Sequence, residues 1–264
     1  HDGHTHSHEH HHGEHSHTHE HHHEHGHEHN HDHEHHHHHH HHHHSHDVNI
    51  VELEKDILHQ NQLGAERNRG FFDALNIFAM NLVSSPGSGK TSLLEKTIAD
   101  LKEEIEFSVI EGDQQTTNDA ARIHALNVPV LQINTGKGCH LDSEMIAKSL
   151  KELKPKQNSI LMIENVGNLV CPAMFDLGEN QRVVIISTTE GEDKPLKYPD
   201  MFYSSNICII NKIDLLPYLK FDVEKLKENT KKVNPNIQFF EVSATSGEGM
   251  EAWYEFLRSK IVKS

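Results

Sequence analysis

The sequence predicts an α/β domain with a mostly parallel sheet over residues 77–264, preceded by a helical segment over 47–76. Short runs of β-branched and other apolar residues alternate with amphipathic stretches from residue 77 onward. This alternation is typical of strands and helices joined by right-handed crossovers. A glycine-rich phosphate-binding pattern also stands between the first of these strands and the helix that follows.

The first 46 residues differ in composition from the rest of the chain. They hold 29 of the 32 histidines and no lysine, arginine or apolar residue, so they cannot bury enough apolar surface to offset the entropy of ordering. We expect a disordered tail over 1–46. Imidazole is a good ligand for nickel, copper, zinc and cobalt. Histidines alternate with acidic and small residues well beyond the run at 35–44, which favours a metal-binding tail over a purification tag.

Charge, hydropathy and cysteine content exclude several classes of protein. The formal net charge is −16, and no basic block interrupts it, which argues against nucleic-acid binding. No stretch approaches the roughly 20 apolar residues that span a bilayer, and no signal peptide is visible. Three cysteines are too few for a disulfide framework. We expect a cytoplasmic protein that binds neither nucleic acid nor membrane.

Residues 51–75 carry apolar side chains at roughly helical spacing, interrupted by Gly64 and Gly70. This predicts one or two helices packed on the domain. The strands predicted after them are 77–84, 107–111, 128–133, 160–164, 182–187, 207–211 and 237–242. The predicted helices are 91–102, 118–126, 141–153, 223–230 and 250–261.

Residues 84–91 read SSPGSGKT, which is the pattern G-x-x-x-x-G-K-[ST] with Ser84 in place of the first glycine. The glycines let backbone N–H groups converge on phosphate oxygens, and the following helix N-terminus adds positive potential. Lys90 should reach the β- and γ-phosphates, and the Thr91 hydroxyl should bind magnesium. The predicted phosphate-binding residues are Pro86, Gly87, Ser88, Gly89, Lys90, Thr91 and Ser92.

Residues 211–214 read NKID and follow an apolar strand. Asp214 can accept hydrogen bonds from guanine N1–H and N2–H₂, which adenine lacks in that arrangement, so discrimination on the order of 1–3 kcal/mol follows. Lys212 can lie along the base, and Asn211 can brace the loop. Ser243 and Ala244 follow the last strand, as in loops that contact guanine O6. The three motifs in this order predict GTP and GDP binding.

Asp113 and Glu164 each follow a predicted strand, and either carboxylate could hold magnesium directly or through water; the alternative is an acid in a solvated loop. Residues 164–167 resemble a D-x-x-G switch ending at Gly167, with Glu for Asp. Asn168 rather than Gln follows, so we expect slow GTP hydrolysis. The predicted catalytic residues are Lys90, Thr91, Asp113 and Glu164. The candidate transition-state arginines are Arg67, Arg69, Arg122 and Arg182.

Cys139, His140 and Cys171 form a candidate second metal site. Two thiolates and one imidazole suit zinc or nickel, and three ligands leave a place for water or for a ligand from a second subunit. Spacing alone favours the alternative of two buried cysteines and a surface histidine. Cys171 lies only four residues after Gly167. A metal bound there would respond to the nucleotide.

In combination, these motifs resemble the HypB family of hydrogenase nickel-incorporation GTPases. The matching stretches are 68–72, 81–91, 111–114, 138–142, 164–172 and 211–214. The resemblance implies a SIMIBI-type P-loop domain that dimerises when GTP is bound. It also implies Cys139, His140 and Cys171 as zinc or nickel ligands at the dimer interface. The implied partners are a HypA-type nickel chaperone and, indirectly, the large subunit of a [NiFe]-hydrogenase.

The sequence departs from the family pattern in two places. Glu144 stands where some members have a further histidine, and the printed sequence contains no Cys-x-x-Cys-x-Cys motif. One alternative is a urease-type nickel-insertion GTPase, whose metal motif resembles Cys-Pro-His, whereas Ala173 follows Cys171 and Pro172 here. The others are a nickel storage protein with a regulatory nucleotide domain, and a signalling GTPase that acts through protein contacts.

Overall fold

The histidine-rich segment and the rest of the chain form two compact units, His1–Ser45 and His46–Ser264. The computed structural model describes residues 7–12, 15–20, 45–113, 122 and 125–261. In the first unit, β1 (Ser7–His12) and β2 (His15–Glu20) pair antiparallel, which the sequence did not predict. A two-stranded hairpin by itself is at most marginally stable in water. The disordered tail over 1–46 therefore stays a prediction, and most of it lies outside the described residues.

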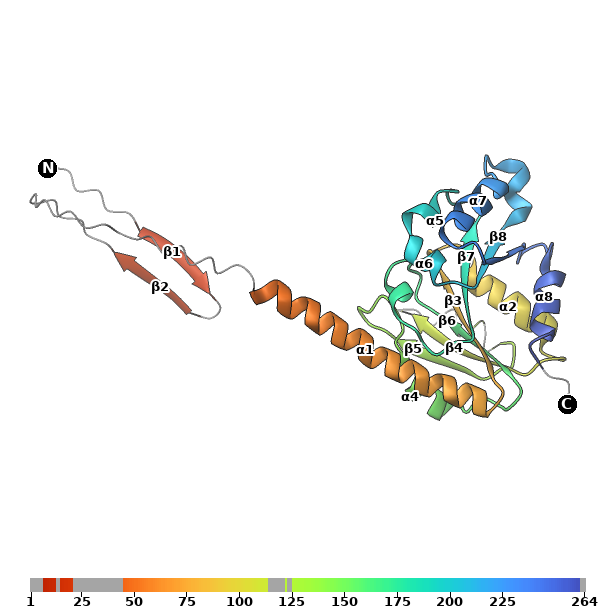
Figure 1. The fold of residues 1–264 in the computed structure, drawn as a ribbon, viewed down its shortest axis with the longest axis horizontal. Helices are drawn as coiled ribbons and strands as arrows, with labels where there is room; N and C mark the ends of the chain where they lie inside the picture. The colour runs from red at the N-terminus through yellow and green to blue at the C-terminus, as the bar shows by residue number, and fades with distance from the viewer. Residues whose placement is uncertain (1–6, 13–14, 21–44, 114–121, 123–124, 262–264) are drawn as a thin grey trace, which may run out of the picture. The chain divides into compact units, whose positions relative to one another are not determined.

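The second unit is built on a seven-stranded sheet in the order β5-β4-β6-β3-β7-β8-β9 (Figure 1). Every neighbouring pair is parallel, so the predicted α/β class with a parallel sheet is confirmed. The strands are β3 (Phe78–Ser84), β4 (Phe107–Asp113), β5 (Val130–Asn134), β6 (Ile160–Glu164), β7 (Gln181–Ser187), β8 (Ile207–Asn211) and β9 (Gln238–Glu241). The helices are α1 (Ser45–Ala74), α2 (Lys90–Leu101), α4 (Ser143–Leu153), η1 (Cys171–Met174), α5 (Lys194–Lys197), α6 (Pro199–Tyr203), η2 (Ile213–Tyr218), α7 (Val223–Val233) and α8 (Met250–Arg258).

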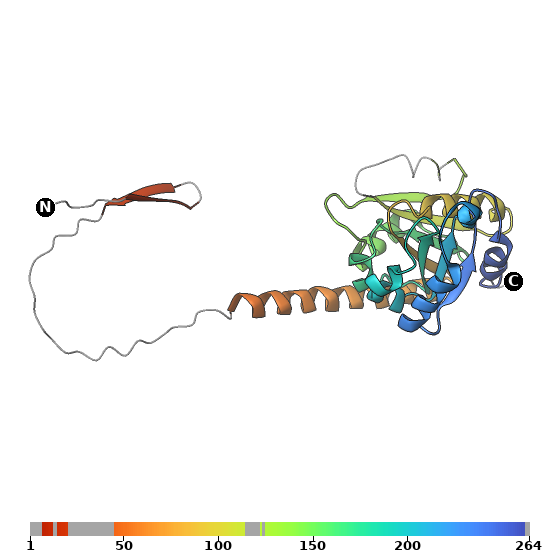
Figure 2. The ribbon, with the colours of Figure 1, turned by 90° about the horizontal axis from the view of Figure 1, so that it is seen from above.

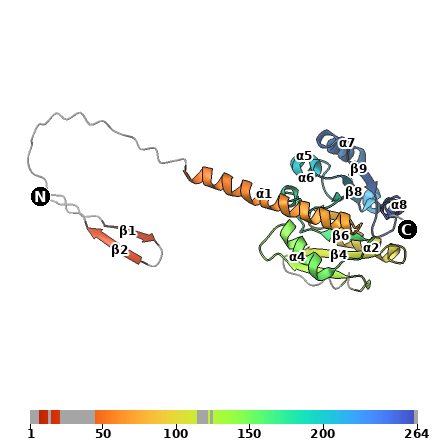
Figure 3. The same ribbon diagram turned by 60° about the horizontal axis from the view of Figure 1, so that its bottom comes forward.

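Helices cover both faces of the sheet, because successive side chains of each strand point to opposite sides. On one face, Leu93 of α2 and Trp253 of α8 pack with Met80 of β3 in one apolar cluster. On the other face, the end of α1 and α4 cover one half, and α6 and α7 cover the other half. Figure 3 shows α1 and α4 on the same side of β4 and β6. Because the strands are all parallel, the loops that follow them lie together at the carboxyl end of the sheet.

The N-terminal helix is one continuous element (Figure 2), so of the one or two helices predicted there the structure has one, and Gly64 and Gly70 do not interrupt it. A helix tolerates an isolated glycine, and at Gly64 the missing side chain has a packing reason: a Cβ atom there would lie 2.2 Å from Ser143 Oγ. The second half of α1 packs on the domain through residues such as Phe72, whereas Leu53 in its first half is exposed.

The remaining predicted elements agree within a few residues, with local reasons for the shifts. The helix predicted from residue 141 begins at Ser143, because Asp142 caps it by accepting a hydrogen bond from Met145 N at 2.7 Å. Most of the predicted helix 118–126 lies outside the described residues. The short helices η1, α5, α6 and η2 were not predicted. Within the described part of the chain, no helix is long and apolar enough to cross a bilayer.

Candidate nucleotide and metal sites

A cavity of about 560 Å³ opens at the carboxyl end of β3, the edge at which parallel α/β sheets bind their ligands. Gly87 and Gly89 have φ angles of 79° and 90°, which favour glycine. A Cβ atom at Gly89 would also lie 2.5 Å from Asn211 Nδ2. All the predicted loop residues line the cavity: Pro86, Gly87, Ser88, Gly89, Lys90, Thr91 and Ser92.

Asn211 connects the three predicted nucleotide motifs. Its Nδ2 donates to Ser88 O at 3.0 Å, and its Oδ1 accepts from Lys212 N at 2.8 Å and Ala244 N at 3.2 Å. Lys212 Nζ in turn donates to Gly87 O at 2.7 Å. The base-binding and phosphate-binding loops are therefore held against each other, as the sequence predicted for Asn211.

Asp214 carries a buried oxygen, Oδ1, that has no hydrogen-bond partner among the described residues. A buried carboxylate oxygen without a donor loses solvation, and the N1–H and N2–H₂ groups of guanine would supply the donors. Ser243 is fully buried, and its Oγ accepts from Ser246 N at 3.0 Å. Since the Ala244 N–H donates to Asn211, a contact of this loop with guanine O6 stays a prediction.

Thr91 and Glu164 meet at the predicted magnesium site. Thr91 Oγ1 donates to Glu164 Oε1 at 2.6 Å, and Lys90 Nζ lies 3.8 Å from the same oxygen. Lys90 and Glu164 are both buried, with 10% and 5% of their side chains exposed. A hydroxyl and a carboxylate beside a phosphate-binding loop are the oxygen donors that magnesium prefers. The residues therefore fit that ion.

A second carboxylate, Glu111, lines the same cavity and was missed by the sequence reasoning. It is 2% exposed and pairs in register with Glu164 on the neighbouring strand β6. The sequence analysis chose Asp113 instead, because it follows the predicted strand. The side chain of Asp113 lies outside the described residues. Residues two apart on a strand share a face, and that period was the signal that could have indicated Glu111.

Cys139, His140 and Cys171 come together although 30 residues separate the loops that carry them. Their ligand atoms all lie within 4.8 Å of one another, and Cys139 Sγ is 3.7 Å from His140 Nδ1. All three are half-buried. The His140 ring stacks on Phe175, with the two centroids 3.8 Å apart. The grouping that the family resemblance implied is present, whereas spacing alone favoured its absence.

The protonation of this cluster suits a metal cation. The hydrogen bond with Cys171, burial and the Coulomb interaction with Cys171 raise the pKa of Cys139, because two thiols in one site cannot both ionise easily without a cation. Burial lowers the pKa of His140, which keeps the imidazole neutral and able to bind metal.

The switch segment 164–167 contacts both sites. A Cβ atom at Gly167 would lie 3.3 Å from Pro86 Cγ, so the segment packs directly on the phosphate loop. Asn165 Oδ1 accepts from Leu141 N at 3.2 Å, one residue after His140. Asn168 Nδ2 donates to Cys139 O at 3.5 Å. The nucleotide loop and the metal cluster therefore share one backbone segment.

Comparison with known proteins decides the family. The family model described as CobW/HypB/UreG, nucleotide-binding domain, matches residues 78–241. The protein named hydrogenase maturation factor HypB of Rhizobium leguminosarum bv. viciae is 58% identical over 208 residues, which cover 79% of this chain and 70% of that protein. The chain belongs to the HypB family.

Two solved HypB structures agree with this assignment. The hydrogenase maturation factor HypB of Archaeoglobus fulgidus is 40% identical with a TM-score of 0.71, over 76% of this chain and 98% of that one. HypB of Helicobacter pylori, solved in complex with nickel, is 39% identical with a TM-score of 0.71, over 76% of this chain and 94% of that one. The predicted P-loop domain of SIMIBI type is confirmed.

All four arginines considered for the HypB-type GTPase site form ion pairs within the chain. Arg67 pairs with Glu144 at 2.8 Å and is not among the residues that line the nucleotide cavity. Arg69 pairs with Asp176 at 2.8 Å, and Arg182 is buried against Glu179. Arg122 pairs with Glu95 and also lines the nucleotide cavity. Of the candidates, it is the one placed to approach a phosphate.

Proposed function

We propose that this HypB-family chain is a GTP-hydrolysing metallochaperone that binds nickel and delivers it for [NiFe]-hydrogenase maturation. The observation that carries the proposal is the thiol and imidazole cluster of Cys139, His140 and Cys171, joined to the nucleotide switch through Asn165. Nickel is the cargo, and zinc fits the same donors. The relative's name and the nickel complex of the H. pylori protein support this function.

The nucleotide cycle proposed for the chain uses GTP, GDP and magnesium. Asp214 reads the base, Lys90 holds the β- and γ-phosphates, and Thr91 with Glu164 or Asp113 holds magnesium. The ion, when bound, would neutralise charge that develops on the transferred phosphoryl group. Since Glu164 begins the segment that reaches Cys139 and Cys171, a change in its ligands would move the metal cluster.

We also propose that the GTP-bound chain forms a homodimer across the metal cluster. Three ligands leave a tetrahedral ion one ligand short, and a two-fold axis would supply a second set. Val170 and Met174, on either side of Cys171, are 56% and 55% exposed, as apolar side chains at an interface would be in the free chain. The mass in solution should double with magnesium and a non-hydrolysable GTP analogue and not with GDP. A monomer with both nucleotides would contradict this.

We expect slow GTP hydrolysis by the dilute protein. Asn168 follows Gly167 where a water-positioning Gln would stand, and no described arginine other than Arg122 lines the nucleotide cavity. Without those groups, the charge of the transition state is poorly stabilised. Phosphate release measured against protein concentration should rise as the chain dimerises. Rapid turnover by the monomer would show that the chain already holds a complete catalytic set.

Deleting the histidine-rich tail and disabling the nucleotide site are expected to have different effects on hydrogenase maturation. We propose that the tail stores or captures nickel, and that transfer proceeds through a HypA-type chaperone. A chain without residues 1–46 should support hydrogenase maturation when nickel is ample and fail when it is scarce. Lys90→Ala, which should weaken GTP binding by about 100-fold, should abolish maturation despite an intact tail. If the tail deletion fails in ample nickel while Lys90→Ala is tolerated, the chain is a storage protein instead.

A further inference from the structure

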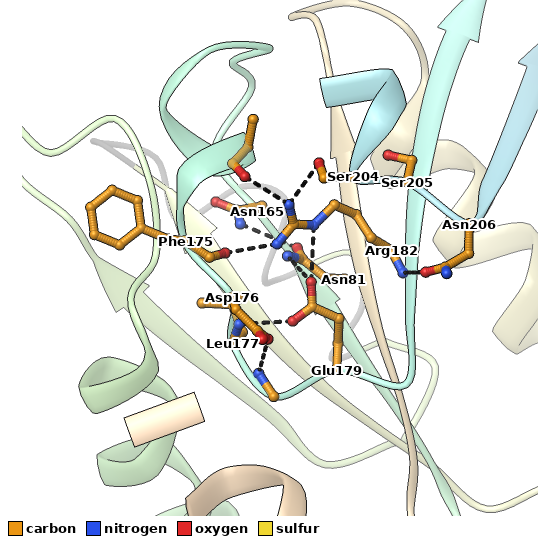
Figure 4. A network of polar contacts seen from close by, with 12 residues as sticks. Asn81, Asn165, Phe175, Asp176, Leu177, Glu179, Arg182, Ser204, Ser205 and Asn206 are labelled. Atoms are coloured by element: carbon orange, nitrogen blue, oxygen red, sulfur yellow. Dashed lines mark hydrogen bonds and ion pairs between the residues drawn. The ribbon is translucent and has the colours of Figure 1, made fainter. Parts of the chain in front are cut away.

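A buried ion pair holds the segment that carries Cys171 (Figure 4). Arg182 Nε donates to Glu179 Oε1 at 3.0 Å, and the two side chains are 7% and 5% exposed. Arg182 Nη1 donates to Ala173 O at 3.0 Å, and Nη2 donates to Phe175 O at 2.8 Å. The guanidinium thus binds one carbonyl within η1 and one immediately after it.

The same ion pair connects to the nucleotide switch through Asn81 of β3. Asn81 Nδ2 donates to Glu179 Oε1 at 3.1 Å, and Asn81 Oδ1 accepts from Asn165 Nδ2 at 3.1 Å. Asn165 directly follows Glu164 and is 1% exposed, and Asn81 is fully buried. A continuous series of buried hydrogen bonds therefore runs from the switch to the backbone beside Cys171.

The free energy of burying this series of polar groups indicates that it fixes a geometry more than it stabilises the fold. Burying an ion pair carries a large desolvation penalty, and an apolar replacement of similar volume is often as stable. Satisfied polar networks do, however, fix one geometry. Near Cys171, the apolar side chains of Val170 and Met174 are exposed, and Pro172 is the buried residue of η1. The two carbonyl contacts of Arg182 add a polar anchor for that segment.

We propose that Asn81, Glu179 and Arg182 are positioning residues that transmit the nucleotide state from Asn165 to the Cys171 segment and so set nickel affinity. The inference deepens the proposed function and rests on it. Binding of magnesium and GTP at Glu164 would move Asn165, and Asn81 would pass that movement to Glu179. Arg182 would then shift the carbonyls of Ala173 and Phe175. Coupling between two sites in proteins is commonly about 5- to 150-fold in affinity.

The test uses the full chain and a signal specific to thiolate-bound nickel. Nickel is added beyond saturation of the histidine tail, and the thiolate-to-nickel charge-transfer absorption is followed with GDP and with a non-hydrolysable GTP analogue. The parent should show an affinity ratio between the two nucleotides of about 5-fold or more. Asn81→Leu removes the hydrogen bonds to Asn165 and Glu179 while keeping the ion pair of Glu179 and Arg182. It should bring the ratio of the two nickel affinities close to one and preserve the nickel affinity measured with GDP.

Two further variants separate positioning from general stability. Arg182→Lys keeps the charge beside Glu179, but an ammonium lacks the planar fork of guanidinium donors, so the ratio should also fall. Asn229→Leu is the matched control, because Asn229 is a buried asparagine of α7 whose Nδ2 donates to Glu192 O at 3.0 Å, outside this series. It should leave the ratio unchanged, and thermal unfolding should confirm that each variant folds.

The outcomes distinguish this inference from the function on which it rests. If the parent holds nickel equally with both nucleotides, nucleotide control of the metal fails, and the positioning role fails with it. If the parent shows the difference and Asn81→Leu and Arg182→Lys retain it, the positioning role is wrong and the proposed function stands. If the variants lose nickel affinity equally with both nucleotides, the pair of Glu179 and Arg182 supports the structure and does not transmit the nucleotide state. If Asn81→Leu does not fold, Arg182→Lys decides.

Discussion

Replacing Cys171 with serine is expected to weaken the thiolate-bound nickel site by about 100-fold or more. Loss of an outer partner of a metal ligand typically weakens binding by about 10- to 100-fold, and loss of a ligand should exceed that. The Cys171 ligand atom lies within 4.8 Å of those of Cys139 and His140, and a serine hydroxyl is a poor substitute for a soft thiolate. The measurement is the thiolate-to-nickel absorption of the full chain at nickel concentrations beyond saturation of the tail.

Cys208 provides the matched control for this experiment. It is fully buried among apolar side chains, and burial raises the pKa of its thiol to about 12, so it stays protonated and offers no thiolate to a metal. Cys208→Ala should leave the absorption intact. An unchanged signal in Cys171→Ser, or an equal loss in Cys208→Ala, would refute the assignment of the cluster.

The nucleotide site was predictable because its motifs are local. A phosphate loop needs a strand, glycines at positions with positive φ, a lysine and a helix N-terminus, and all of these lie within about a dozen residues of sequence around Gly87 and Gly89. The NKxD motif likewise follows directly from β8. The strand order itself places both motifs at one edge of the sheet, so their meeting follows from the fold class.

The metal cluster and the continuity of α1 depend on packing that sequence spacing does not contain. Cys139 and Cys171 meet because their loops, one after β5 and one after β6, are held together by Asn165 and Asn168. Gly64 interrupts the apolar spacing and left open whether one or two helices form there, because glycine has low helix propensity. Its actual role, close approach to Ser143, involves a residue almost eighty positions away.

Arg182 shows the same limit for charged residues. It was one of the four candidate transition-state arginines, and it stands at the start of an apolar strand, where a buried arginine is rare without a partner. Glu179, three residues away, is visible in the sequence as that partner. The amide of Asn81 becomes its neighbour through the strand register of β3 and β7, in which Asn81 pairs with Arg182. The carbonyls of Ala173 and Phe175 become its partners through the folding of η1 against β7.

Asp214→Asn is expected to change the base that the chain prefers. The carboxylate would accept from guanine N1–H and N2–H₂, and its Oδ1 is buried with no partner among the described side chains and backbone groups. An asparagine can still accept from N1–H, but its amide N–H₂ would face the guanine N2–H₂ group. One lost charged hydrogen bond and one opposed donor pair should together weaken GDP binding by about 3 kcal/mol, or about 100-fold.

Xanthine nucleotides separate a recognition effect from a folding defect. Xanthine has a carbonyl oxygen at C2 in place of the amino group, so the side-chain amide that this substitution introduces could donate to it, and xanthosine diphosphate should bind the variant better than GDP does. Asp222→Asn is the control, because Asp222 caps α7 by accepting from Lys225 N at 3.0 Å, and asparagine caps helices as well as aspartate. Competition binding of the two diphosphates measures the preference. If Asp214→Asn binds neither base, or still favours guanine, the guanine specificity must come from other groups, since Asn211 and Lys212 hold the phosphate loop through Ser88 and Gly87.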